Sequence, residues 1–221
     1  MISNIRPLCW NLLLLFCSLT VCSQDKTIDS LLTMLNAAKR DTNKVKLFND
    51  LASKYISINN TVKATSYADS SELLATALYY KTGKANAIVL KGQAESKKGN
   101  RENAVGKYKL AANLYHELGD KTAEANTFTS IAGEYAQKDN YVEALRYRHA
   151  AMKLYEELNI KDGLMRTFLG IGSVYGNLAN YPEAMKYFFT VLKMAKEAGN
   201  KNIIAGALRN LSVLYQYENN L

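Results

Sequence analysis

The residue types that most often carry out catalysis or bind metals are scarce in this sequence of 221 residues. It contains two histidines, His116 and His149, which do not form the His-x-x-x-His spacing of a zinc-binding helix. Its three cysteines, Cys9, Cys17 and Cys22, all lie in a short N-terminal segment. If that segment is removed, no thiol remains for a disulfide, a metal site or a nucleophile. We therefore expect no catalytic residue, no metal ion and no cofactor.

Two further groups of residues have a simpler explanation than chemistry. Gly170, Gly172 and Gly176 faintly resemble a dinucleotide-binding loop, but they lie inside a helical pattern with no strand before them. Glu156 and Glu157 alternate with lysines, which is typical of a solvated helix face. No Ser-His-Asp arrangement is specific enough to propose. The sequence therefore predicts a protein that binds a partner rather than an enzyme.

The charge balance would suit a nucleic-acid partner, because 28 basic residues face 20 acidic ones and the net charge is +8. The basic residues are nevertheless dispersed. Their densest group, Lys97, Lys98 and Arg101, lies at a predicted turn, and elsewhere they alternate with acidic residues along helix surfaces. We therefore expect no nucleic-acid partner.

The N-terminal residues 1–23 have the layout of a secretory signal peptide. Arg6 precedes an apolar stretch over residues 12–19, and small residues follow up to Ser23. The apolar stretch is shorter than the about 20 residues that cross a membrane. We expect cleavage after Ser23, an exported chain in the periplasm or at the cell surface, and no membrane span in the mature region.

Two alternatives concern the same segment. One is a retained membrane anchor. The other is a lipoprotein acylated at Cys22, although Val21 stands where such signals resemble one another in having Gly, Ala or Ser.

A repeat of 40 residues runs through the rest of the chain. Asparagine marks each period, as Asn60, Asn100, Asn140, Asn180 and Asn220. Alanine follows the first four asparagines by four residues, and a small residue precedes each of the five by eight. A large apolar residue precedes each by twelve, and tyrosine precedes all but one by five, Glu95 being the exception. Columns that keep in phase over five periods indicate repeated copies of one structural unit.

Each unit is predicted to be two helices joined by a tight turn. In the fourth unit, helical spacing forms one apolar stripe from Phe168, Ile171, Gly172 and Tyr175. We expect the turn at residues 179–180, with Asn180 in the left-handed conformation that ends a helix. Pro182 suits the first turn of the second helix, which is expected to stop at Gly199. Tyrosine and phenylalanine side chains are expected to fill the gaps between units.

These columns resemble the tetratricopeptide repeat: large apolar, small, tyrosine, turn, alanine. The resemblance covers residues 44–221, as four full repeats and the first helix of a fifth, with an N-terminal capping helix over residues 24–43. Its period of 40 rather than 34 resembles the extended-repeat branch of the family and implies longer second helices. The second unit departs from the pattern at Lys91 and Glu95. The resemblance implies an all-α fold, a right-handed α-α superhelical solenoid of helical hairpins.

In such a solenoid the first helices line the concave surface, and the residues facing it lie beside the buried stripe. Helical spacing from the large apolar column selects ten polar residues for this wall: Asn49, Asp50, Asn86, Gln93, Asn126, Thr129, Arg166, Ser173, Arg209 and Asn210. Carboxamides that donate and accept suit an extended peptide, and the two arginines suit a carboxylate. The alternative is that these residues only solvate a groove.

Two functions are compatible with this pattern. The first is a protein- or peptide-binding scaffold of the bacterial envelope. The second is the N-terminal extracytoplasmic sensor region of a membrane-bound signalling regulator with a histidine kinase or DNA-binding output, which exported arrays of this kind resemble. The sequence stops after the first helix of the fifth repeat, so we expect either a fragment of a longer protein or a C-terminal edge that self-associates or docks a further chain.

Overall fold

The computed structural model describes residues 26–218, so the predicted signal peptide lies outside the described residues. The described residues are helical, with short turns and no strand between them, and a helix over residues 26–37 precedes the repeats. The helices that follow are α2 (Thr42–Ser57), α3 (Thr61–Ala77), α4 (Lys81–Lys97), α5 (Arg101–Leu118), α6 (Lys121–Ala136), α7 (Tyr141–Glu157), α8 (Lys161–Asn177), α9 (Tyr181–Glu197) and α10 (Lys201–Glu218). This confirms the predicted all-α class.

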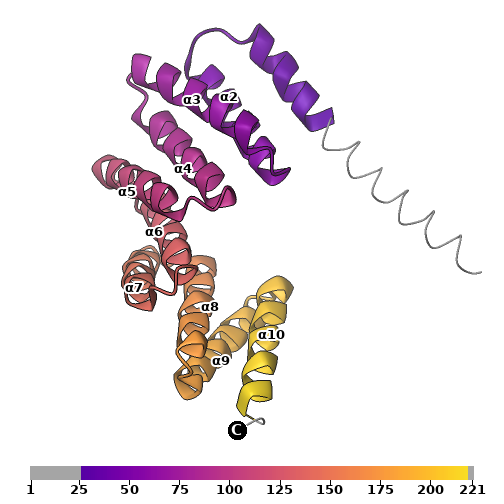
Figure 1. The fold of residues 1–221 in the computed structure, drawn as a ribbon, viewed down its shortest axis with the longest axis vertical. Coiled ribbons are helices and arrows are strands. Elements are labelled where there is room, and N and C mark those ends of the chain that lie inside the picture. The colour runs from indigo at the N-terminus through magenta and orange to yellow at the C-terminus, as the bar shows by residue number, and fades with distance from the viewer. Residues whose placement is uncertain (1–25, 219–221) are drawn as a thin grey trace, which may run out of the picture. The chain divides into compact units, whose positions relative to one another are not determined.

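The helices belong to two compact units, and the boundary falls inside α4 between Leu90 and Lys91. Unit 1, up to Leu90, holds α2, α3 and the start of α4 (Figure 1). Its α2 and α3 pack side by side over the buried side chains of Val45 and Leu74. Unit 2, from Lys91 onward, holds the rest of α4 and helices α5 to α10.

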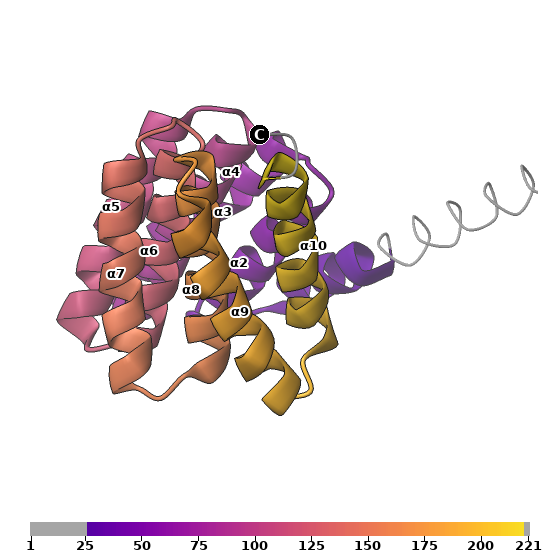
Figure 2. The same ribbon diagram turned by 90° about the horizontal axis from the view of Figure 1, so that it is seen from below.

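Unit 2 is a stack of helical hairpins. Each helix from α5 to α10 packs against the next one along the chain, and α8 also contacts both α6 and α10 (Figures 1 and 2). The first helices of successive repeats, α6, α8 and α10, therefore lie next to one another. This arrangement confirms the predicted solenoid of helical hairpins.

The repeated asparagine is a helix cap. Asn60, Asn140 and Asn180 each accept, through the side-chain oxygen, a hydrogen bond from the backbone N–H three residues ahead. This bond satisfies an N–H that the first turn of the second helix leaves unpaired. The prediction that Asn180 is left-handed is wrong, because its φ is −86° and the left-handed residue is Ala179, at φ 56°. The Asn180 side chain caps α9, and the preceding residue, Ala179, adopts the left-handed conformation of the turn.

Glu95, the exception in the tyrosine column, takes part in a different turn. Its carboxylate accepts hydrogen bonds from Lys98 Nζ and Asn100 Nδ2, each at 2.8 Å. These bonds lower the pKa of Glu95, with that from Lys98 having the largest effect. Asn100 makes no side-chain cap bond to α5. Its amide instead donates back to Glu95, near the end of α4.

Aromatic rings pack in the same way in three repeats, and this packing uses six of the fifteen tyrosines. The column tyrosine of the first helix stacks on a tyrosine of the second helix in the pairs Tyr55–Tyr67, Tyr135–Tyr147 and Tyr175–Tyr187, with centroids 5.4–5.8 Å apart. A phenylalanine from the first helix lies against the same second-helix ring. These rings join the two helices of one repeat, whereas the sequence prediction placed them between repeats.

Candidate functional site

The predicted wall residue Asn49 is not available at the surface of unit 1. It is 9% exposed, and its Nδ2 donates to the backbone oxygen of Gly83 at 3.3 Å. A Cβ added at Gly83 would lie 2.7 Å from Val45 Cγ1, so the missing side chain lets α4 approach α2 closely. The placement of Asn49 on an open wall is therefore wrong, because the side chain fastens two helices together. Asp50 and Asn86, in the same unit, are exposed as expected.

In unit 2 the predicted wall residues lie at or near the surface. Their exposed members are Asn126, Arg166, Ser173 and Arg209, and the half-buried ones are Gln93, Thr129 and Asn210. The hydroxyls of Thr129 and Ser173 donate to the backbone carbonyl four residues earlier, at 3.0 and 2.9 Å. Each hydroxyl oxygen keeps acceptor capacity for a ligand.

The two wall arginines differ in their partners. Arg166 Nε donates to Asp162 Oδ2 at 2.7 Å in an ion pair whose two side chains are more than half exposed. Such a pair is weak in water, so it yields to a stronger partner at little cost. Arg209 is exposed and makes no ion pair with any described residue. In the 40-residue register Arg209 corresponds to Leu169, so the two arginines stand one helical turn apart on neighbouring helices.

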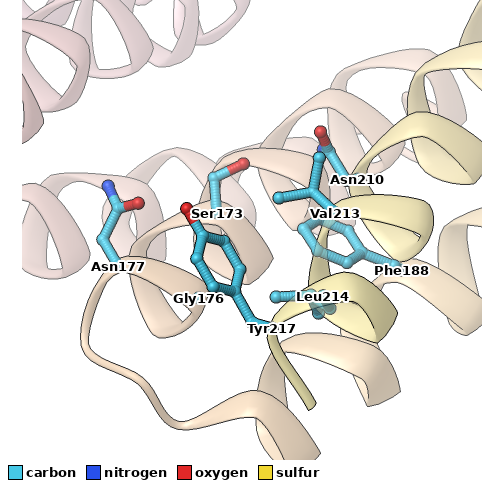
Figure 3. A pocket seen from close by; sticks show the side chains of 8 residues that line it. All are labelled: Ser173, Gly176, Asn177, Phe188, Asn210, Val213, Leu214 and Tyr217. Carbon is cyan, nitrogen blue, oxygen red and sulfur yellow. The ribbon is translucent and has the colours of Figure 1, made fainter. Parts of the chain in front are cut away.

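A pocket of about 140 Å³ opens between α8 and α10 (Figure 3). Two of the predicted wall residues, Ser173 and Asn210, come together at this pocket. The complete lining is Ser173, Gly176, Asn177, Phe188, Asn210, Val213, Leu214 and Tyr217. A Cβ added at Gly176 would lie 3.3 Å from Leu214 Cδ2, so glycine keeps the space above Leu214 open.

The pocket combines an apolar base with a polar rim. Phe188 and Leu214 are buried, while the amides of Asn177 and Asn210 and the hydroxyls of Ser173 and Tyr217 line the same space (Figure 3). An apolar base of this size takes a side chain, and the amides around it can bond the backbone that carries that side chain. The arrangement therefore suits one residue of an extended chain.

Of the eight pocket residues, sequence reasoning selected Ser173 and Asn210 for the wall, and it missed three others, all of them exposed. Asn177 and Tyr217 occupy one column of the repeat, and Val213 occupies the column of Ser173. Asn177 and Tyr217 lie one helical turn beyond the last position selected from the large apolar column. Val213 lies at a selected position but is apolar, so a choice of polar residues passed over it. Continuing the same helical spacing to the end of the first helix would have found Asn177 and Tyr217.

A second polar group lies on α6 and α7. The Tyr155 hydroxyl donates to Asn126 Oδ1 at 2.8 Å, which holds the wall amide in place. Burial raises the pKa of Tyr155, so this hydroxyl keeps its proton and remains a donor at neutral pH. The amide nitrogen of Asn126 is left to donate to a ligand.

The described residues give no sign of a metal site. Among residues 26–218, no three His, Cys, Asp or Glu side chains gather closely enough to hold a metal ion. His116 lies against a single carboxylate, with its Nδ1 3.1 Å from Glu124 Oε1. No helix in this part of the chain is both long enough and apolar enough to cross a membrane.

No protein-family model matches the sequence, and no curated protein matches it. Solved structures do. Aspartyl phosphate phosphatase F from Bacillus subtilis has a TM-score of 0.77 at 17% identity, over 82% of this chain and 48% of its own. A signal transduction ATPase from Pyrococcus horikoshii, which has a tetratricopeptide repeat sensor, has a TM-score of 0.78 at 19% identity, over 87% of this chain and 30% of its own. A Rap protein complexed with competence and sporulation factor has a TM-score of 0.69 at 15% identity, over 90% and 62%.

These similarities establish the fold: the chain is a tetratricopeptide-like repeat solenoid. It spans less than two thirds of the length of each of these three proteins. Identities of 15–19% do not transfer an activity or a ligand from any of them.

Proposed function

We propose that this chain is a protein- or peptide-binding scaffold, and that the surface formed by α6, α8 and α10 holds an extended segment of the partner. The pocket between α8 and α10 carries the proposal, because it joins an apolar base to amides and hydroxyls from two neighbouring first helices. Extended peptides bind where side-chain pockets alternate with groups that bond the backbone. The exposed amide of Asn126 and the exposed side chains of Arg166 and Arg209 extend the polar surface along the same helices.

The proposal is tested by selecting peptides from a displayed random library on the intact chain and titrating them against two variants. Ser173→Phe places a ring at the pocket and is expected to weaken a selected peptide at least tenfold, about 1.4 kcal/mol. Thr190→Phe is the matched control. Thr190 is also exposed and also donates to the carbonyl four residues earlier, but it lies on α9. Its replacement should leave the affinity unchanged.

Two results would contradict the proposal. One is the absence of any peptide enriched above an unrelated protein. The other is a loss of affinity in Thr190→Phe with none in Ser173→Phe, which would move the site to the second helices.

The proposed location is the bacterial envelope, reached by export through residues 1–23. The layout of Arg6, the apolar stretch and the small residues up to Ser23 supports it. Cleavage after Ser23 predicts that the exported protein begins at Gln24, which N-terminal sequencing measures. A mature protein that begins at a lipidated Cys22 would replace this with a lipoprotein, and an unprocessed N-terminus would indicate a retained anchor.

A second candidate function is the sensor region of a larger signalling regulator. The similarity to a signal transduction ATPase with a tetratricopeptide repeat sensor favours it, since this chain covers 30% of that protein. Sequencing the gene beyond the codon for Leu221 decides between the two. A membrane helix followed by a kinase or DNA-binding region would support the sensor, and a stop codon would support the scaffold.

A further inference from the structure

Arg148 occupies a position that its neighbours in the repeat use for the core. In the 40-residue register it corresponds to Tyr108 and Phe188, both of which are buried. Each of those rings packs against a glycine of the first helix, Gly92 or Gly172. In the third repeat Ala132 replaces that glycine. The third repeat therefore has a guanidinium where the second and fourth have an aromatic ring.

The guanidinium of Arg148 lies against α8 at Gly170. A Cβ added at Gly170 would lie 2.3 Å from Arg148 Cζ and 2.5 Å from its Nε, so a side chain here would displace the guanidinium. The same column holds Asp50, Leu90, Ser130 and Asn210 in the other repeats, and Asn210 lines the pocket. The Arg148 side chain, which comes from the second helix α7, thus occupies a position where the other repeats have a side chain of the first helix.

This cation has no counter-ion among the described residues. The Nε of Arg148 is buried without a hydrogen-bond partner, and its side chain makes no ion pair within residues 26–218. Burial lowers the pKa of Arg148, and the nearby Tyr155, itself held neutral by a raised pKa, offers no full charge to offset this. A buried donor without a partner carries a desolvation cost, which a ligand that accepts a hydrogen bond from it would offset.

The surroundings of Arg148 favour one kind of ligand. Arg166 lies four residues before Gly170 on α8, one helical turn from the position where the Arg148 guanidinium lies. Arg148, Arg166 and Asp162, the ion-pair partner of Arg166, all act electrostatically on the Tyr155 hydroxyl. Asn126, held by that hydroxyl, adds an amide donor. The planar fork of a guanidinium matches a carboxylate through two parallel hydrogen bonds. Arg148 as a whole residue is half-buried, so part of its side chain remains at the surface.

We propose that Arg148, passing over Gly170 and supported by Asn126 and Arg166, is a carboxylate-binding site for an acidic side chain or the C-terminal carboxylate of the bound peptide. The site rests on the proposed peptide-binding function. It differs from the predicted wall because its central residue comes from a second helix.

The test uses an array of random peptides in two kinds of matched pair. In the first kind, the C-terminus is a free carboxylate in one member and an amide in the other. In the second kind, one member has Asp and Glu where the other has Asn and Gln. The wild-type chain is expected to prefer the carboxylate member of the pairs it binds. Arg148→Met is expected to reduce that binding at least tenfold, to the level of the amide partner. Arg146→Met is the matched control, because Arg146 is exposed on the same helix and already paired with Glu143. It should leave the preference intact.

Gly170→Ala gives a second variant that keeps both charges, and it should lose the preference because the added Cβ displaces the guanidinium. A thermal melt checks folding, and Arg148→Met should be at least as stable as the wild type, since it removes a poorly solvated charge.

Binding without a carboxylate preference, or a preference retained in Arg148→Met, would contradict the carboxylate site but not the proposed scaffold function. A wild type that binds no peptide would overturn both. Carboxylate pairs that differ only in the C-terminus would locate the ligand there, and pairs that differ only in Asp or Glu would locate it in a side chain.

Discussion

Replacing Phe188 by alanine is expected to lower the free energy of unfolding by about 3–5 kcal/mol, the range for removing a large side chain from a packed core. Phe188 is 2% exposed, and it forms a buried cluster with Ala184, Leu211 and Leu214. Its ring also fills the space left by Gly172, where an added Cβ would lie 2.6 Å from it. The cluster joins α9 to α10, so the cavity would open at a contact between helices that cannot close without moving one of them.

The neighbouring residue provides the control. Phe189 is 48% exposed, and Phe189→Ala should cost less than about 1 kcal/mol because it removes little buried surface. Urea unfolding of both variants, followed by circular dichroism, measures the difference. Similar losses in the two variants would show that the register of α9 is misplaced.

Replacing Glu134 by alanine is expected to cost about 2–3 kcal/mol, since hydrogen bonds to a charged group contribute about 1.5–3 kcal/mol each. Glu134 is 7% exposed and lies on α6. Its carboxylate accepts from Ser96 Oγ of α4 at 2.5 Å and from Arg101 Nη1 of α5 at 3.0 Å. The side chain therefore ties three helices together. The loss is smaller than for a fully buried ion pair because Arg101 is 31% exposed and can be hydrated once its partner is gone.

An exposed ion pair in the next helix provides the comparison. Glu143 pairs with Arg146 three residues along α7, and Glu143→Ala should cost less than about 1 kcal/mol. Both variants are measured by the same unfolding experiment at low and at moderate salt. An equal, salt-sensitive loss in the two would mean that Glu134 acts as an ordinary surface charge.

Much of the fold could be predicted because the repeat constrains it in several independent ways. The period located the turns, the apolar columns gave the buried stripes, and Pro182 and Gly199 marked the start and end of α9. The role of Asn180 was misjudged because the left-handed turn position and the N-cap of the next helix are adjacent in the chain. Both positions favour asparagine, so its residue type does not tell them apart. The left-handed position is filled by several residue types in different repeats, so it leaves no column in the sequence.

The candidate site was harder to predict because it depends on how closely helices approach. Asn49 is buried since Gly83 brings α4 close to α2, and a pattern of one helix does not report its distance from another. Arg148 was missed for a related reason. It lies on a second helix, and its guanidinium occupies the space that a side chain at Gly170 would fill. Spacing along a helix predicts which way a residue faces, whereas glycines on the neighbouring helix decide how far its side chain extends.

The central claim, that the surface of α6, α8 and α10 binds the partner, is tested most directly by site-specific photo-crosslinking. A benzophenone amino acid is placed either at Asn210 in the pocket or at Thr190 on α9, and the chain is irradiated with a selected peptide. We expect a crosslinked product from position 210 that an excess of unlabelled peptide prevents, and none from position 190. Crosslinking from position 190 with none from position 210 would contradict the claim.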